Sequence, residues 1–222
     1  MGVYVTGFLM ALKGLPMTLF VSLLAVAIGA TLGLLLAFMK MSKNTLARVI
    51  SKAYIEIIRG TPMIVQALIF AYGIPILLQS AGIPFKWPVL LIPAIIVCGG
   101  NSAAYMAEVI RGGLQSVDPG QIEAAYSLGM TKRQANRYVI LPQAFKIVTP
   151  SFGNEFVTLI KETSVLAYVG VVETLRSAQL WNADTFETFA AYIGAALVYL
   201  AVTYPLSKVV ARMEKKMSEG AA

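Results

Sequence analysis

Long apolar stretches without a charged side chain dominate the pattern of this chain. No Asp, Glu, Lys or Arg lies between Lys13 and Lys40, and none lies between Arg59 and Lys86. A helix needs about 20 apolar residues to cross the hydrocarbon core of a bilayer. The pattern predicts five membrane-spanning helices, at about residues 15–39, 54–78, 88–110, 147–172 and 189–210. The fourth is the least apolar of the five.

The basic residues indicate how these predicted spans are oriented. Most Lys and Arg side chains lie in segments 40–52, 111–146 and 208–216, which five spans place on one side of the membrane. Lys and Arg concentrate in short cytoplasmic loops. We therefore predict an all-α membrane protein, a single transmembrane domain over residues 1–222, with its N-terminus outside and its C-terminus in the cytoplasm.

Composition and charge exclude several classes of function. Of the 222 residues 58% are hydrophobic and 13% are charged, whereas a soluble domain has about 25% charged residues. The net charge of +7 follows the topology and does not indicate nucleic-acid binding. The chain has no histidine, one cysteine (Cys98) and no glycine-rich nucleotide loop. We therefore expect no metal, no cofactor and no enzymatic activity in this chain.

The long polar segment at residues 117–142 carries helix-capping signals. Asp118 is a good N-cap, and Gln121 lies three residues after it, which is the spacing of a capping box. Thr131 and Gln134 repeat that spacing. The segment therefore predicts two short helices, at about residues 122–128 and 133–139, in place of a flexible linker.

The residues at the ends of these short helices predict a compact hook. Gly129 is placed to end the first helix in the left-handed conformation, and Pro142 is placed to stop the second. The first helix has small residues at Ala124 and Ala125. Such a hook suits docking into a groove on another protein. The alternative is an amphipathic segment that lies on the lipid surface.

Within this hook, Glu123-Ala124-Ala125, Gly129 and Leu141-Pro142 resemble the EAA loop of the permease subunits of binding-protein-dependent ABC importers. Val139 stands where that loop usually has Ile. Further segments resemble the polar and basic amino-acid permeases of that family (those for histidine, glutamine and arginine). These segments are residues 14–19, 57–62 with Gln66, 101–105 with Glu108 and Arg111, 153–155 and 161–164. The resemblance covers about residues 10–212.

The resemblance implies a division of labour in the plasma (inner) membrane of a bacterium. This chain would form the pathway with a second permease subunit, either another copy or a paralogue. Separate ATPase subunits would bind ATP and Mg²⁺, and an extracellular binding protein would deliver the amino acid. The residues implied to couple this chain to the ATPase are Glu123, Ala124, Ala125, Gly129, Leu141 and Pro142.

Charged residues inside the fourth predicted span are candidates for substrate binding. An ionisable side chain in a bilayer usually faces a partner or a water-filled cavity. Glu155 lies about nine residues into this span, near the midplane, and is the best candidate to hold a substrate cation. This position favours a basic amino acid. Lys161 and Glu162 lie nearer the outer interface, where they either contact substrate or mark the end of the helix.

The third predicted span offers a polar face. Asn101 and Tyr105 are four residues apart and share one side of a helix, and Ser102 lies close to them. Asn101 can donate to and accept from the backbone groups of an amino acid. Its alternative role is a hydrogen bond between helices. Arg59, in the second predicted span, is expected to anchor that span at the interface or to pair with Glu56, and gating is the alternative.

The leading hypothesis is thus the permease subunit of an ATP-driven importer for a polar, basic amino acid. An ion-coupled secondary transporter or channel is the alternative, although no internal repeat of the kind common in such transporters is visible. A membrane-embedded enzyme is a third class, but a chain with no histidine, no cysteine pair and no convincing carboxylate dyad has few groups for acid–base catalysis. The sequence leaves open which amino acid is carried and whether two copies or two paralogues pair.

Overall fold

A computed structural model describes residues 2–219, and these residues form helices and no strand. In chain order the elements are α1 (Val3–Leu12), α2 (Leu15–Met41), α3 (Thr45–Gly60), α4 (Met63–Leu68), the π-helix η1 (Ile69–Gly73), α5 (Ile74–Ser80), α6 (Leu91–Gln115), α7 (Pro119–Ser127), α8 (Lys132–Ala135), the π-helix η2 (Asn136–Ile140), α9 (Leu141–Glu162), the 3₁₀-helix η3 (Thr163–Val169), α10 (Thr174–Thr185) and α11 (Thr188–Glu219).

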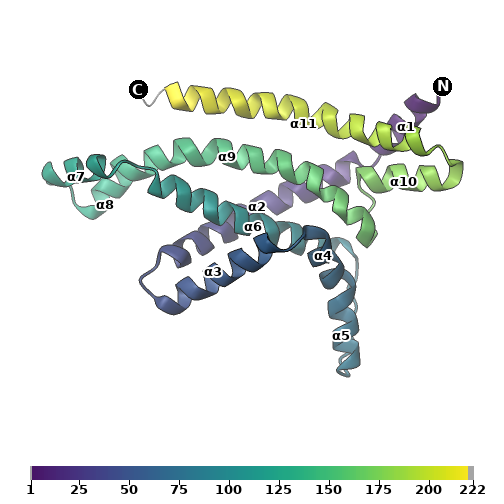
Figure 1. Cartoon of the computed structure of the whole chain (residues 1–222), viewed down its shortest axis with the longest axis horizontal. Coiled ribbons are helices and arrows are strands. Elements are labelled where there is room, and N and C mark those ends of the chain that lie inside the picture. Colours follow the sequence, from purple (N-terminus) through teal and green to yellow (C-terminus); the bar gives the residue numbers. More distant parts are fainter. Residues whose placement is uncertain (1, 220–222) are drawn as a thin grey trace.

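The long helices α2, α6, α9 and α11 run along the long axis of the molecule (Figure 1). α7 and α8 lie at one end of this bundle, and α1 and α10 lie at the other, so that the two termini are at opposite ends (Figure 1). α4, η1 and α5 project away from the bundle as an arm. We call the two ends of the bundle the hook end and the α10 end.

Small residues let α2 and α6 form the central helix pair. A Cβ atom on Gly29 would overlap the Ser102 side chain, and one on Gly33 would lie 2.6 Å from Cβ of Met106. Glycines at this spacing allow close approach of two helix backbones. The α2–α6 interface is therefore packed within one chain and places Ser102 in the protein interior.

Four of the predicted spans correspond to apolar segments long enough to cross a membrane: Val3–Met41, Met63–Ser80, Leu91–Gln115 and Thr188–Met217. The first is longer than expected, because α1 precedes α2 with a break only at Lys13–Gly14. The fourth predicted span corresponds to α9 and η3. α9 is not among the four apolar segments, since its polar residues lower its hydropathy, and its place as a span stays a prediction.

The span predicted at residues 54–78 is not one continuous helix, because the chain breaks at Thr61–Pro62. Both residues have extended backbone, with ψ of 143° and 136°. Pro62 has no N–H to donate to the carbonyl of Ile58. The Gln66 amide donates to that carbonyl at 2.8 Å and to the Thr61 carbonyl at 3.1 Å. This side chain thus satisfies the broken end of α3 and sets the direction of the arm.

Pro142 does not stop the second helix of the hook, contrary to the sequence prediction. α8, η2 and α9 follow one another without a break from Lys132 to Glu162. The π-helical turn at Asn136–Ile140 lies directly before Pro142, which stands in the first turn of α9. A proline is tolerated in a first turn because its missing N–H has no helical partner there. The second helix of the hook is therefore continuous with α9.

Candidate functional site

Glu155 lies in the middle of α9 with its side chain half-buried. Its carboxyl group is close enough to Ser102 on α6 and to Glu162 for electrostatic interaction. The Ser102 hydroxyl is buried and makes no hydrogen bond within residues 2–219. Buried polar groups in proteins are nearly always paired. Glu155 and Ser102 thus lie near each other where α9 packs against α6, and Glu162 is within electrostatic range of Glu155.

Lys161 differs from the two acidic residues of α9 in its exposure. Glu162 lies seven residues after Glu155, on the same face of α9, and is partly buried, whereas Lys161 is exposed. Of the three charged candidates on α9, Glu155 is the one near Ser102, and Lys161 is close enough to Glu162 for electrostatic interaction.

Asn101 is held in the interior, only 5% exposed. Its amide donates to Oε1 of Gln66 over 3.5 Å, from α6 to α4. This is the interhelical bond named as the alternative for Asn101. Gln66 thus joins α3, α4 and α6. The sequence motif that contains Gln66 did not predict this role, because its partners depend on a break in the chain that periodicity does not reveal.

Tyr105 does not point to the same place as Asn101, although one helical turn separates them. Its ring is 38% exposed, and the guanidinium carbon of Arg59 lies 5.2 Å from the ring centroid. The expected pair of Arg59 with Glu56 is wrong, since Glu56 pairs instead with Lys52, four residues before it, at 3.7 Å. Arg59 thus belongs to a separate pocket with Tyr105.

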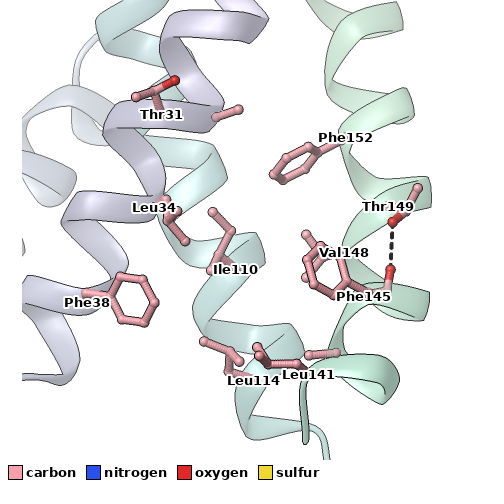
Figure 2. A pocket seen from close by; sticks show the side chains of 12 residues that line it. Thr31, Leu34, Phe38, Ile110, Leu114, Leu141, Phe145, Val148, Thr149 and Phe152 are labelled. Atoms are coloured by element: carbon pink, nitrogen blue, oxygen red, sulfur yellow. Dashed lines mark hydrogen bonds between the residues drawn. The ribbon is translucent and has the colours of Figure 1, made fainter. Parts of the chain in front are cut away.

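A further pocket between α2, α6 and α9 is almost entirely apolar, with a volume of about 440 Å³. Figure 2 shows Phe38, Phe145 and Phe152 lining it from two sides. Its Thr149 hydroxyl is already used, since it donates to the carbonyl of Phe145 at 2.7 Å (Figure 2). A polar amino acid would find no charged partner there. Leu141, assigned to the coupling loop by the resemblance, also lines this pocket.

The hook is capped nearly as predicted. Asp118 is the N-cap of α7 but accepts from the backbone N–H of Gly120 at 2.7 Å, so the capping box with Gln121 is not formed. Thr131 and Gln134 form the predicted capping box at α8.

Gly129 ends α7 as expected, in the left-handed conformation with φ of 79°. Its N–H donates to the carbonyl of Tyr126 at 2.9 Å, and the N–H of Met130 donates to the carbonyl of Ala125 at 3.1 Å. These two bonds define a Schellman motif. The turn between the two hook helices therefore depends on a backbone conformation that glycine adopts without strain.

The hook presents an outer surface that the rest of residues 2–219 leaves exposed. Glu123 and Ala124 are exposed while Ala125 is buried, only 3% exposed, so the small-residue pair has one inner and one outer member. Leu128 is 80% exposed and Tyr138 is 63% exposed. Pro142 is exposed as well. Large apolar side chains on a protruding, capped hook are typical of a protein interface.

Glu173 is a structural residue that the sequence analysis did not identify. Its side chain is 0% exposed and caps α10, accepting from the backbone N–H groups of Leu175 at 3.0 Å and Arg176 at 2.8 Å. The Tyr199 hydroxyl of α11 donates to it at 2.5 Å, and Thr18 of α2 donates at 3.5 Å. Burial raises the pKa of Glu173, and these donors oppose that rise. The carboxylate therefore ties three helices together at the α10 end.

No group of three or more Asp, Glu or Cys side chains within residues 2–219 could hold a metal ion. The arrangement that the structure does offer is a polar cluster between α6 and α9, together with a hook at one end of the bundle.

The sequence profile of the family "Binding-protein-dependent transport system inner membrane component" matches residues 29–219. The chain is 36% identical over 215 residues to the "Probable amino-acid permease protein YxeN" of Bacillus subtilis (strain 168), covering 97% of this chain and 94% of the relative. It is 34% identical to the "Glutamine transport system permease protein GlnP" of Escherichia coli (strain K12), covering 93% and 92%.

The chain is also similar to chains of solved ABC transporter structures. The "Crystal structure of an amino acid ABC transporter with histidines" contains a chain that is 40% identical, with a TM-score of 0.85 and coverage of 93% of this chain and 94% of that one. A chain of the MetNI methionine ABC transporter in an inward-facing conformation shares the fold, with a TM-score of 0.66 at 20% identity. The matched relatives are permeases and not enzymes. The chain therefore belongs to the family of inner membrane components of binding-protein-dependent transport systems.

Proposed function

We propose that this chain forms the translocation pathway of an ATP-driven importer for a polar amino acid. The relatives named for amino-acid or glutamine transport support this substrate class, as does the related transporter solved with histidines. An extracellular binding protein would deliver the amino acid. A second permease subunit would complete the pathway, and ATPase subunits would bind ATP and Mg²⁺. No observation favours an ion-coupled transporter or channel.

The polar cluster between α6 and α9 carries the assignment of substrate contacts. Glu155 and Glu162 supply carboxyl groups inside an apolar bundle, and the buried Ser102 hydroxyl lies close to Glu155. We assign the α-ammonium or the basic side chain of the substrate to Glu155. This assignment favours a basic amino acid such as arginine, lysine or histidine over a neutral one. Asn101 would reach the substrate only by exchanging its bond to Gln66, and Lys161 and Tyr105 lie outside the cluster.

We further propose that α9 crosses the membrane as the fourth of five spans, in the bacterial plasma membrane. With the N-terminus outside, the hook end lies in the cytoplasm, where Glu123, Ala124 and Gly129 reach the ATPase. The hook is continuous with α9, which also carries Glu155. A movement of the ATPase against the hook would therefore be transmitted along one helix to the substrate cluster.

Transport by the complete complex tests the substrate assignment. The complex is purified with its ATPase subunits, and ATP-driven uptake of arginine, histidine and glutamine is measured in proteoliposomes with the binding protein. Glu155→Gln should reduce uptake of arginine about tenfold more than uptake of glutamine, since a charge-assisted hydrogen bond is lost. Glu187→Gln, which changes an exposed carboxylate in the α10–α11 loop, is the control. Equal losses for the two substrates would refute the counter-charge.

Cysteine labelling tests the topology. Cys98 is 0% exposed and should not react in the folded protein. A single cysteine introduced at Ser127 should react with a membrane-impermeant maleimide only from the cytoplasmic side, and one at Thr185 only from outside. Labelling of the Ser127 position from outside would refute the proposed orientation and the docking of the hook.

A further inference from the structure

An open polar pocket of about 440 Å³ lies between the C-terminal end of α2, α3 and α6. The side chains that matter to its chemistry are Lys40, Glu56, Arg59, Tyr105 and Glu108, and Gly60 leaves space at its rim, with no atom within 4 Å of the position of a Cβ. We call it the exit pocket. It is distinct from the cluster of Glu155 and Ser102.

One positive charge in the exit pocket has no acidic partner. Lys40 and Glu108 form an ion pair, and Glu108 also pairs with Arg111 at 2.8 Å. Glu56 pairs with Lys52. Arg59 makes no ion pair with any described residue, and its guanidinium is held over the Tyr105 ring. The pocket therefore offers an uncompensated, positioned guanidinium.

The exit pocket lies directly beyond the proposed substrate region along α6. Tyr105 and Glu108 are three residues apart on α6 and both line the exit pocket. Asn101 lies about one helical turn of 5.4 Å before Tyr105. Since α6 ends next to α7 at the hook end (Figure 1), a solute that moves along α6 from the level of Asn101 toward the hook end would next reach the level of Tyr105 and Arg59.

The faces of α3 show which kind of ligand can reach this pocket. Arg48, Lys52, Glu56 and Arg59 recur at spacings of four, four and three residues and form a polar stripe. The exposed apolar residues Leu46, Ile50 and Ile57, each more than half exposed, lie on a different side of the helix. Because the apolar side is the one suited to lipid, the polar stripe and the pocket face water. A water-borne solute fits this position better than a lipid headgroup.

We propose that the exit pocket is a second, inward-facing binding site for the transported amino acid, in which Arg59 binds the α-carboxylate. This inference rests on the proposed amino-acid import. The planar guanidinium matches a carboxylate with two parallel hydrogen bonds. Tyr105 is a positioning residue that holds Arg59 by a cation–π contact. Glu56, which is 64% exposed and loosely paired, can exchange Lys52 for the substrate ammonium.

Equilibrium binding to the intact complex tests the pocket. The complex is placed in nanodiscs of zwitterionic lipid, without ATP and without binding protein, and binding of the radiolabelled amino acid that the wild type transports best is measured. The wild type should bind two equivalents per permease chain. Arg59→Gln should weaken one of them about tenfold or more, by loss of a charge-assisted contact. Arg48→Gln, which removes the same charge about 16 Å away on the same face of α3, should leave both unchanged.

Two further variants separate binding from folding. Gly60→Leu fills the rim of the pocket while keeping every charge, and it should weaken the same equivalent as Arg59→Gln. Glu155→Gln should weaken only the other equivalent. The α-carboxamide of the same amino acid, which has no carboxylate, should not occupy the exit pocket. If Arg59→Gln and Gly60→Leu leave both equivalents intact, or if the carboxamide binds as well as the acid, the exit pocket is refuted.

Three further outcomes distinguish lipid binding, failure of the proposed function and failure of the second site alone. If adding anionic lipid to the nanodiscs displaces the amino acid from the wild type but not from Arg59→Gln, the pocket binds lipid phosphate and the inference is overturned. If the wild type neither binds nor transports any amino acid of the panel, the proposed function itself fails. A single equivalent that depends on Glu155 and not on Arg59 would retain the proposed function and refute the second site.

Discussion

The two ends of this bundle treat their polar groups in opposite ways. At the α10 end, Glu173 is fully buried and receives donors from two backbone N–H groups, Tyr199 and Thr18. At the hook end, Leu128 and Tyr138 extend from the surface, and in the exit pocket Arg59 has no acidic partner. The Glu173 carboxylate has its hydrogen-bond donors within residues 2–219, whereas the Arg59 guanidinium has no acidic partner among them. Side chains that are satisfied internally support stability, and those left open indicate where function takes place.

The largest effect is expected from removing the carboxylate of Glu173. Glu173→Ala leaves two backbone donors and the Tyr199 hydroxyl without a partner, and it should lower the free energy of unfolding by about 3 kcal/mol. Thermal unfolding of the purified complex measures this loss. ATP-driven uptake per folded molecule should stay within about twofold of the wild type. A stable variant with impaired uptake would reverse the contrast between the two ends.

A change in the hook should impair transport. In Gly129→Val a β-branched residue must adopt φ near 79°, which costs about 1–2 kcal/mol and tilts the two hook helices against each other. Uptake should fall about tenfold, while membrane insertion and ATP hydrolysis continue. Gly129→Asn is the matched control, because asparagine tolerates the left-handed region and should retain more uptake. Equal uptake by both variants and the wild type would contradict coupling through this turn.

A smaller loss is expected at Tyr199, which supplies one of the donors to Glu173. Tyr199→Phe removes a single hydrogen bond and should destabilise the folded protein by about 1 kcal/mol. Tyr192→Phe, on the same helix with its side chain 42% exposed, should change the unfolding temperature very little. The unfolding temperatures of the two variants, measured in the same detergent, test whether the Tyr199 hydroxyl stabilises the folded protein. A larger effect at Tyr192 would show that the α10 end is stabilised elsewhere.

The smallest effect concerns pH. Because burial raises the pKa of Glu173 above its ordinary value, this residue contributes stability at low pH that is lost as the pH rises through the raised pKa. The unfolding temperature of the wild type relative to Glu173→Gln should therefore fall as the pH rises above the ordinary pKa of a glutamate side chain. A constant difference over this range would show that the hydrogen-bond donors cancel the effect of burial.

Regular patterns in the sequence were sufficient for much of the fold and for the hook. The uncharged runs predicted α2 and α11, and the Thr131–Gln134 spacing predicted the capping box of α8. Gly129 was predicted in the conformation that it adopts. These features are local, because a cap or a turn depends on residues within one helical turn. Prolines were harder to interpret: Pro62 interrupts the predicted span at residues 54–78, and Pro142 is accommodated where a helix was expected to stop.

The candidate site was predicted less completely, for a physical reason. Glu155 and Ser102 were both named, but their juxtaposition requires α6 and α9 to pack together. Tyr105 was grouped with Asn101, yet Arg59 on α3 draws it into a different pocket. Glu173 in the sequence resembles any loop carboxylate, because its partners Thr18 and Tyr199 are 155 and 26 residues away.

The sequence alone determined that this is a helical membrane protein with a capped hook, since hydrophobicity and capping act over a few neighbouring residues. Only the tertiary structure decided which polar side chains are satisfied and which stay available to a ligand or partner. Pairing depends on distances of a few ångströms between helices that lie far apart in the chain. Those distances are set by packing, as where Gly29 admits Ser102 to the interior.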